Sequence, residues 1–196
     1  ASCLVGSEMC IRDSFRHMDR EEELEAKRQR VQDALTRIGG LELTVEEILG
    51  AKNPEHYRNK SQYPVDAGGQ VGFYKARSHQ VIPVDCCRIQ KPQADAAAEA
   101  LRRYIRECGV PCYDERTRRG LVRHLYVRTN SAGQSLVCVL VNGKKLPCED
   151  ALVSFMRQAL PDAVGVVLGV NTRPTGAVLG LSLIHISEPT RQEAIS

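Results

Sequence analysis

The first 50 residues contain one segment with a clear helical pattern, residues 19–40. Asp19 stands where an N-cap is expected, acidic residues fill the first turn, and basic residues follow. A pair of glycines ends the segment. We predict a long amphipathic helix here. Its narrow apolar stripe should pack against another domain, and it consists of Leu24, Val31, Leu35 and Ile38.

A second, shorter helical signal follows at residues 44–49. Thr44 and Glu47 have the spacing of a capping box, in which each side chain bonds to the other's backbone N–H. We therefore predict one further turn of helix at this point.

Beyond residue 56 the pattern changes from helical to alternating. A glycine pair and a short polar turn separate three runs rich in β-branched and aromatic residues. Such spacing favours an antiparallel meander, and two prolines inside the runs place parts of it at strand ends or edges. The predicted strands are residues 57–65, 70–76 and 80–87.

The rest of the chain predicts a helix, a hairpin, a second helix and a last strand. The first helix begins with proline and ends at glycine, and the hairpin has a Ser-Ala-Gly turn. These elements span residues 92–109, 121–130 with 134–142, 149–160 and 163–171. The fold class is therefore expected to be α+β: an antiparallel β-meander and β-hairpin with packing helices, preceded by a long amphipathic helix.

Composition narrows the class of protein without identifying it. The chain has 196 residues, 42% of them hydrophobic, and a formal net charge of +3, which suits one ordinary globular domain. No apolar run reaches the roughly 18–20 residues that span a bilayer, and no basic flank with an apolar core begins the chain, so we expect no membrane partner and no secretory signal. The eight cysteines are irregularly spaced, which favours reduced thiols or a metal site in the cytoplasm over disulfides.

The two ends of the chain could be encoded by closely related DNA sequences. Residues 182–191 can be encoded so that the reverse complement, shifted by one base, translates to residues 4–12. Such a relation is typical of a translated sequencing adapter. We therefore expect residues 1–14 and 182–196 to be non-biological, so that Cys3, Met9, Cys10 and His185 form no site. Residues 15–50 are then a helical segment and residues 51–181 a central RNA-binding α+β domain, together a piece of a longer protein.

Cations and aromatic rings alternate on the predicted meander. Arg58 and Lys60 share one face of its first strand; Tyr74, Lys75, Arg77 and His79 occupy the second strand and the turn after it. Phosphates attract Arg and Lys, and unstacked bases lie on aromatic rings, so this pattern favours RNA binding. The pattern alone is equally consistent with a solvated face whose aromatic residues cover a core.

Four stretches together resemble the bacterial RNA uracil-5-methyltransferase family, in its 23S ribosomal RNA branch: "FRHMDREEELEAKRQRVQDALTRIGGL", "HYRNKSQYPV", "GFYKARSHQVIPVDCCRIQ" and "NTRPTGAVLG". The resemblance extends over most of the chain. It implies S-adenosylmethionine as methyl donor, 23S rRNA as partner, and an RNA-binding role for the six residues above. It also implies that the Rossmann-like methyltransferase domain is absent from this chain, which alone should be inactive.

The resemblance further implies an iron–sulfur role for Cys87. Relatives of this branch hold a 4Fe-4S cluster with three cysteines of one motif and a fourth after the third meander strand, the position of Cys87. The other three ligands are expected just before Phe15.

Three alternatives stay open. One is a stand-alone, non-catalytic RNA-binding module, and another is a transfer-RNA-directed relative. The third is a cysteine-based metal or redox protein, which requires other thiols to converge on Cys87, from among Cys108, Cys112, Cys138 and Cys148. We predict no catalytic residue and no protein partner, and the remaining histidines are dispersed along the chain.

Overall fold

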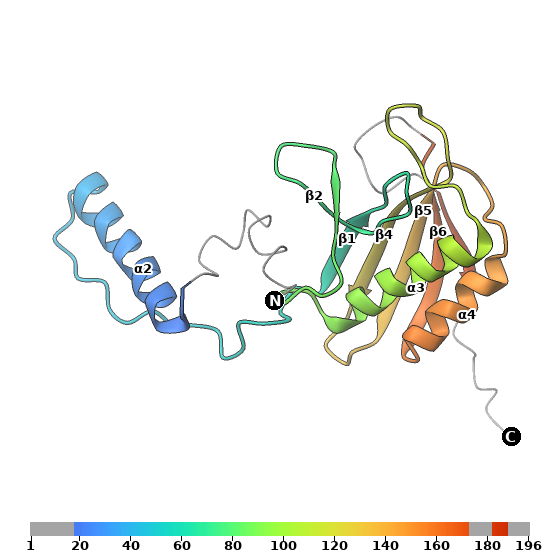
Figure 1. The fold of residues 1–196 in the computed structure, drawn as a ribbon. Helices are drawn as coiled ribbons and strands as arrows, with labels where there is room; N and C mark the ends of the chain where they lie inside the picture. The colour runs from blue at the N-terminus through green and yellow to red at the C-terminus, as the bar shows by residue number, and fades with distance from the viewer. Residues whose placement is uncertain (1–17, 173–181, 188–196) are drawn as a thin grey trace, which may run out of the picture.

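The computed structural model describes residues 18–172 and the backbone of one further strand, Ser182–Ser187. Figure 1 shows a helical segment on one side and a sheet backed by two helices on the other. No helix among the described residues is both long and apolar enough to cross a membrane.

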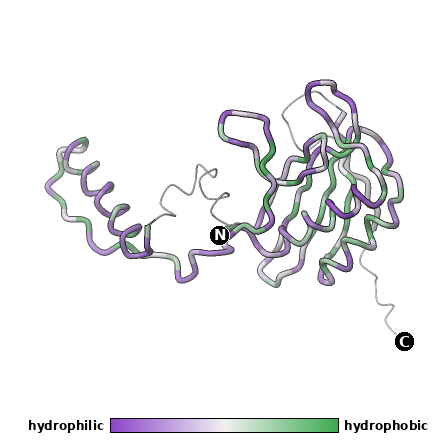
Figure 2. Tube along the Cα trace, viewed as in Figure 1, coloured by the Kyte–Doolittle hydropathy of each residue, from purple (hydrophilic) through white to green (hydrophobic). Residues whose placement is uncertain are grey.

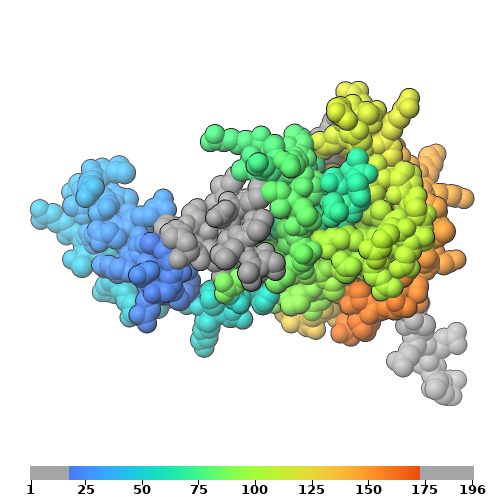
Figure 3. Space-filling model, viewed as in Figure 1, coloured from blue at the N-terminus to red at the C-terminus, as the bar shows by residue number. Residues whose placement is uncertain are grey.

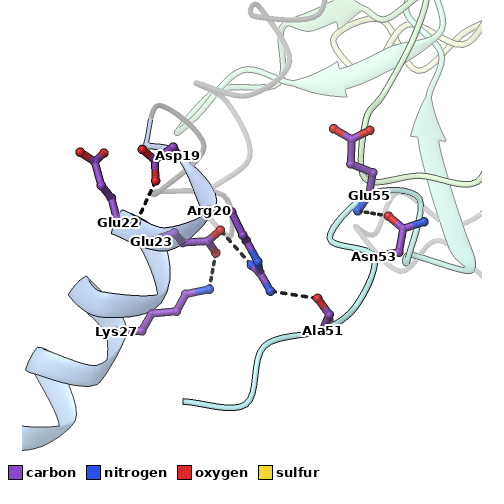
Figure 4. A network of polar contacts seen from close by, with 8 residues as sticks. All are labelled: Asp19, Arg20, Glu22, Glu23, Lys27, Ala51, Asn53 and Glu55. Carbon is purple, nitrogen blue, oxygen red and sulfur yellow. Dashed lines mark hydrogen bonds and ion pairs between the residues drawn. The ribbon is translucent and has the colours of Figure 1, made fainter. Parts of the chain in front are cut away.

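The predicted first helix is confirmed. Helix α2 spans Arg20–Asp33 and continues into one π-helical turn, η1 (Ala34–Ile38). Asp19 is its N-cap, and the Asp19 Oδ1 atom accepts a hydrogen bond from the Glu22 backbone N at 2.9 Å (Figure 4). None of its residues is buried: Val31 and Ile38 of the apolar stripe are exposed, and Leu24 and Leu35 are half-buried.

The predicted helical turn at residues 44–49 is wrong. These residues belong to an extended strap, residues 39–51, that runs back along α2. The Gln32 side chain holds the strap, because its Nε2 donates to Leu43 O and its Oε1 accepts from Val45 N, both at 2.8 Å. The strap backbone therefore bonds to α2 rather than forming a helical turn of its own.

The main sheet has five strands in the order β1-β4-β5-β6-β7. Its neighbours pair antiparallel except β5 with β6, which are parallel and joined by helix α4 (Glu149–Ala159). The strands are β1 (Lys60–Pro64), β4 (Val122–Thr129), β5 (Ser135–Val141), β6 (Ala163–Val170) and β7 (Ser182–Ser187). The antiparallel sheet expected from the sequence therefore contains one parallel pair, β5 with β6. The almost uninterrupted apolar runs of β5 and β6 are typical of strands buried on both faces, as parallel strands are.

The predicted three-stranded meander is also wrong. Strands β2 (Gly72–Tyr74) and β3 (Val81–Pro83) form a separate two-stranded ribbon, while β1 pairs with β4, for example Tyr63 with Leu125. Only one isolated bridge, Val65 to Val71, joins β1 to the segment that leads into β2. The eight-residue strand β4 offers β1 a longer partner than the three-residue β2, although it lies much farther along the chain.

Helices α3 (Pro92–Cys108) and α4 cover one face of the main sheet (Figure 1). The core between them contains fully buried side chains from both layers: Leu101, Tyr104, Leu125, Val139, Leu152, Met156 and Leu168. In Figure 2 the strands of the main sheet and the helix faces that cover it are largely apolar, whereas α2 is largely hydrophilic. We call the main sheet, its two helices and the β2–β3 ribbon the sheet part. The predicted helices and the β4–β5 hairpin are confirmed, and Gly109 ends α3 with a positive φ of 59°.

Strand β7 lies within the segment that we expected to be adapter-derived. It pairs with the outer edge of β6, so the backbone of that segment completes the sheet. An alternating segment can pair with an open sheet edge whatever its genetic origin. The pairing therefore does not test where the segment came from.

Candidate nucleic-acid interface

Four of the six predicted RNA-binding residues lie together on the β2–β3 ribbon: Tyr74, Lys75, Arg77 and His79. A tight turn, residues 75–80, carries three of them, and the Lys75 backbone N donates to Gln80 O at 2.8 Å. Arg77 takes a positive φ of 57° at the turn. Figure 3 shows this part of the chain projecting from the sheet part. Lys75 and Arg77 are both exposed to solvent.

The other two predicted residues lie at the start of β1. Arg58 forms a bridge with Gln90, and its Nε donates to Lys60 O at 3.2 Å. Lys60 is exposed and lies directly opposite Arg128 of β4, which is exposed as well. Because directly paired residues share a face of a sheet, the two cations project on the same side.

That side is the one facing away from α3. The next pair along the two strands, Ser61 and Val127, is buried toward the helices, and alternation turns Lys60 and Arg128 the opposite way. Arg128 was not among the residues predicted to bind RNA, although it is the one charged residue that follows the apolar alternation at the end of β4. The predicted cations therefore form two groups, one on the turn and one on the open face of β1 and β4.

A pocket lies at the base of the β2–β3 ribbon, and we call it the hairpin pocket. Tyr74 and His79 line it from the ribbon, and a loop at residues 113–119 forms the facing wall. Glu115 of that loop contacts both Tyr74 and His79 of the opposite wall. The Tyr74 hydroxyl donates to Glu115 Oε1 at 3.1 Å, and His79 Nδ1 lies 2.6 Å from Glu115 Oε2.

The environment of Tyr74 keeps its hydroxyl protonated. Burial, followed by the charge of Glu115, raises the pKa of Tyr74 to about 12. The His79 ring meets the Tyr74 ring edge-on, with 5.5 Å between the centroids. The two predicted aromatic contacts with RNA are thus joined in one wall of the pocket.

Two adjacent residues of β4, Arg123 and His124, line the pocket from the sheet. A bulge between Val122 and His124 lets both be buried, with 6% and 8% of their surfaces exposed. The Arg123 guanidinium lies 4.4 Å from the centroid of the Tyr113 ring, and its Nη1 donates to Asn171 O at 2.8 Å.

His124 is a neutral imidazole at neutral pH. Burial and then the charge of Arg123 lower the pKa of His124 to about 4. Neither Arg123 nor His124 was predicted to belong to a site. The signal that could have found them is an Arg-His pair inside the otherwise apolar strand of residues 121–127.

Cys87 is half-buried between β3 and α3. Its backbone N donates to Asp95 Oδ2 at 3.0 Å, and burial is the main cause that raises the pKa of Asp95. Among residues 18–172, no group of three His, Cys, Asp or Glu side chains could hold a metal ion. The alternative in which other thiols converge on Cys87 therefore fails for that part of the chain. The three cluster ligands expected before Phe15 lie outside the described residues.

Comparison with known proteins identifies relatives over most of the chain. An uncharacterized RNA methyltransferase of Clostridium tetani is 39% identical over 170 residues, covering 85% of this chain and 37% of that protein. Proteins of the same description in Caldanaerobacter subterraneus and Gloeobacter violaceus are 33% and 35% identical, covering 89% and 92% of this chain and 39% and 40% of theirs. The chain thus spans about two fifths of the length of these relatives. No family model matches it.

A solved structure shares the fold. The crystal structure of the Pyrococcus abyssi tRNA (uracil-54, C5)-methyltransferase, in complex with S-adenosyl-L-homocysteine, matches with a TM-score of 0.69 at 16% sequence identity. The match covers 88% of this chain and 40% of that one. Our statement that the Rossmann-like methyltransferase domain is absent is corrected accordingly: a chain that shares its fold with part of a methyltransferase gives that statement no support.

Proposed function

Because the chain is a relative of RNA methyltransferases over 85–92% of its length, we propose that it forms the RNA-binding part of an S-adenosylmethionine-dependent uracil-5-methyltransferase that acts on 23S ribosomal RNA. The observation that carries the proposal is the projecting turn with Lys75 and Arg77 above an aromatic pocket, in a chain with such relatives. Exposed cations attract phosphates, and rings offer stacking surfaces to unpaired bases.

The proposed interface comprises the six predicted residues, Arg58, Lys60, Tyr74, Lys75, Arg77 and His79, together with Arg128. The turn and the open face of β1 and β4 supply the cations, while Tyr74 and His79 supply the rings. Tyr63 takes no part, because it is buried and its hydroxyl donates to Asp95 Oδ1 at 3.1 Å. RNA is thus expected to contact the ribbon and β1, and not the face covered by α3.

S-adenosylmethionine would supply the methyl group to the whole enzyme. Parallel strands place cofactor sites at their carboxyl ends, here the connection from β5 to α4 at residues 142–148. That connection has one glycine and two lysines and no acidic residue. It does not fit the cofactor, and we assign none of the described residues to it.

The central experiment measures binding of the 196-residue chain to a 23S rRNA segment at several salt concentrations. The double variant Lys75→Ala/Arg77→Ala should bind more weakly, and its salt dependence should fall by about 1–2 in the log–log slope, because one counterion is released per phosphate contact. Lys144→Ala/Lys145→Ala is the matched control. It removes two exposed cations from another loop and should leave the slope unchanged.

Two results would contradict the proposal. Equal losses in the two double variants would show only a general charge effect, and no binding at all would remove the RNA-binding function. Transfer RNA as competitor tests the target: stronger displacement by tRNA than by 23S rRNA would favour the transfer-RNA-directed alternative. Transfer of labelled methyl groups by the chain alone would contradict the assignment of binding without catalysis.

We also propose Cys87 as one ligand of an iron–sulfur cluster in the full-length enzyme. Its half-buried position leaves room for a ligand role, and thiolates suit iron. Cys86 is the matched control, since it is the exposed neighbour on the same segment. Cys87→Ser should lower the iron content per chain of the full-length enzyme and Cys86→Ser should not; equal iron content in both variants would exclude the role.

A further inference from the structure

The proposed phosphate contacts leave the hairpin pocket without an assigned ligand. Its volume is about 220 Å³, and four segments enclose it: the turn after β1, the β2–β3 ribbon, the loop at residues 113–119 and the start of β4. Lys75 and Arg77 are not part of its lining. The pocket is therefore a separate feature beside the cationic turn.

Four rings line the pocket: Tyr74, His79, Tyr113 and His124. The first two are in edge contact, and the third is stacked under the Arg123 guanidinium, whose centre lies 4.4 Å from the ring centroid. Aromatic rings and guanidinium planes are the surfaces on which proteins stack unpaired bases. The lining thus favours a flat, unsaturated ligand.

The charges around the pocket disfavour a phosphate. Its lining has three carboxylates, on Asp66, Asp114 and Glu115, against the two guanidinium groups of Arg116 and Arg123. Hydrogen bonds from the backbone of the following residues, first of all the Arg116 N–H, hold the pKa of Asp114 below its ordinary value. A neutral ring avoids the repulsion that an anion would meet here.

His124 supplies the hydrogen-bonding group. It is 92% buried, and its Nδ1 atom has no hydrogen-bond partner among the described residues. Buried polar atoms are nearly always paired, and each exception needs a physical explanation. A neutral imidazole nitrogen can accept from an N–H or donate to a carbonyl, according to its tautomer, and both groups occur on the edges of nucleobases.

We propose that the hairpin pocket receives one unstacked nucleobase of the RNA strand whose phosphates lie on Lys75 and Arg77. The base stacks against Tyr74 and His79, and its edge pairs with Nδ1 of His124. This inference rests on the proposed RNA-binding function and adds a base-specific contact to it.

The test uses the full 196-residue chain and single-stranded RNA taken from 23S rRNA, in which each position in turn is replaced by an abasic residue. One position should lose about 5- to 100-fold in affinity, the range for one stacked base, and its neighbours much less. Tyr74→Ala should bind the intact RNA more weakly by a similar factor and lose its sensitivity at that position. Tyr57→Ala is the matched control, because it removes a 58% exposed ring outside the pocket and should keep the position-dependent loss.

The outcomes separate this inference from the function on which it rests. A flat abasic profile in the wild-type chain would overturn the pocket and leave the phosphate contacts intact. Additive losses from Tyr74→Ala and the abasic residue would also overturn it, since they would show that the ring and the base do not meet. Failure of the Lys75→Ala/Arg77→Ala variant to weaken binding would instead reject the proposed function itself.

Discussion

The helical segment and the sheet part differ in whether their apolar side chains are buried. Both contain apolar side chains at regular spacing, yet α2 and η1 bury none of them, whereas the sheet part encloses a continuous core. Ile38 and Leu49 of the helical segment are 87% and 96% exposed. The regular spacing of apolar residues therefore shows that a helix can form. Whether the helix buries those residues depends on a partner surface against which they can pack.

Polar contacts hold the helical segment together. Figure 4 shows Arg20 and Lys27 on either side of Glu23, with Arg20 also donating to Ala51 O of the strap at 3.3 Å. Such partly exposed pairs contribute about 0–1 kcal/mol each, while the burial of one large apolar side chain contributes roughly 1.5–3 kcal/mol. The helical segment should therefore open well before the sheet part.

The largest expected effect comes from the core. Leu125→Ala should lower the free energy of unfolding by about 2–5 kcal/mol, because it removes a fully buried side chain and leaves a cavity. Leu35→Ala makes the same chemical change in η1 and should leave the main transition within about 0.5 kcal/mol. The chain has no tryptophan, so urea unfolding is best followed by circular dichroism. Equal losses from the two variants would show that α2 and the core unfold as one unit.

Acid should destabilise the sheet part through His124. The pKa of His124 is about 4 in the folded chain against an ordinary value of 6.5, so the unfolded chain takes up the proton first. Stability should fall by about 3 kcal/mol as the pH drops from about 6.5 to about 4. The measurement is the urea midpoint across that range.

His124→Gln removes this titration and should flatten the pH dependence relative to wild type. The other ionisable groups that line the pocket, His79, Asp66, Asp114 and Glu115, are present in both proteins. The difference between the two profiles therefore isolates His124. Parallel profiles would contradict its burial as a neutral group.

The smallest expected effect concerns the strap. Gln32→Ala removes the two hydrogen bonds of Gln32 to the strap and leaves those of Arg20 and Arg28 in place. Because the Val45 amide loses its acceptor, it should exchange with solvent about 5- to 10-fold faster, equivalent to roughly 1 kcal/mol. Gln29→Ala is the control, because the Gln29 side chain donates only to Asp33 Oδ1 within α2. Unchanged exchange at Val45 would show that some other contact fixes the strap.

Most local signals predicted the local structure, and the exception is the capping-box spacing of Thr44 and Glu47, which forms no helical turn. The N-cap at Asp19, the proline and glycine at the ends of α3, and the turn of the β4–β5 hairpin depend on a few neighbouring residues, and all of them are confirmed. The pairing of β1 with β4 joins residues about 65 positions apart, which no local pattern specifies. The parallel pairing of β5 and β6 agrees with their continuous apolar runs, which are typical of parallel strands.

Part of the candidate site was also predictable from the sequence. Tyr74 and His79 were expected to contact RNA, and the structure places both on one wall of the hairpin pocket. Glu115, Arg123 and His124 complete the pocket, and they come from a loop and a strand bulge whose positions depend on the tertiary fold. The sequence therefore identifies residue types that can bind RNA, whereas the tertiary fold determines which of them lie close together.

The most direct test of the account is amide hydrogen exchange of the 196-residue chain with and without a bound 23S rRNA segment. We predict that RNA slows exchange at residues 75–80 and 113–119, around the turn and the pocket, and leaves the Val45 amide of the strap unchanged. Protection confined to α2 and the strap, with no change at the turn, would contradict the account.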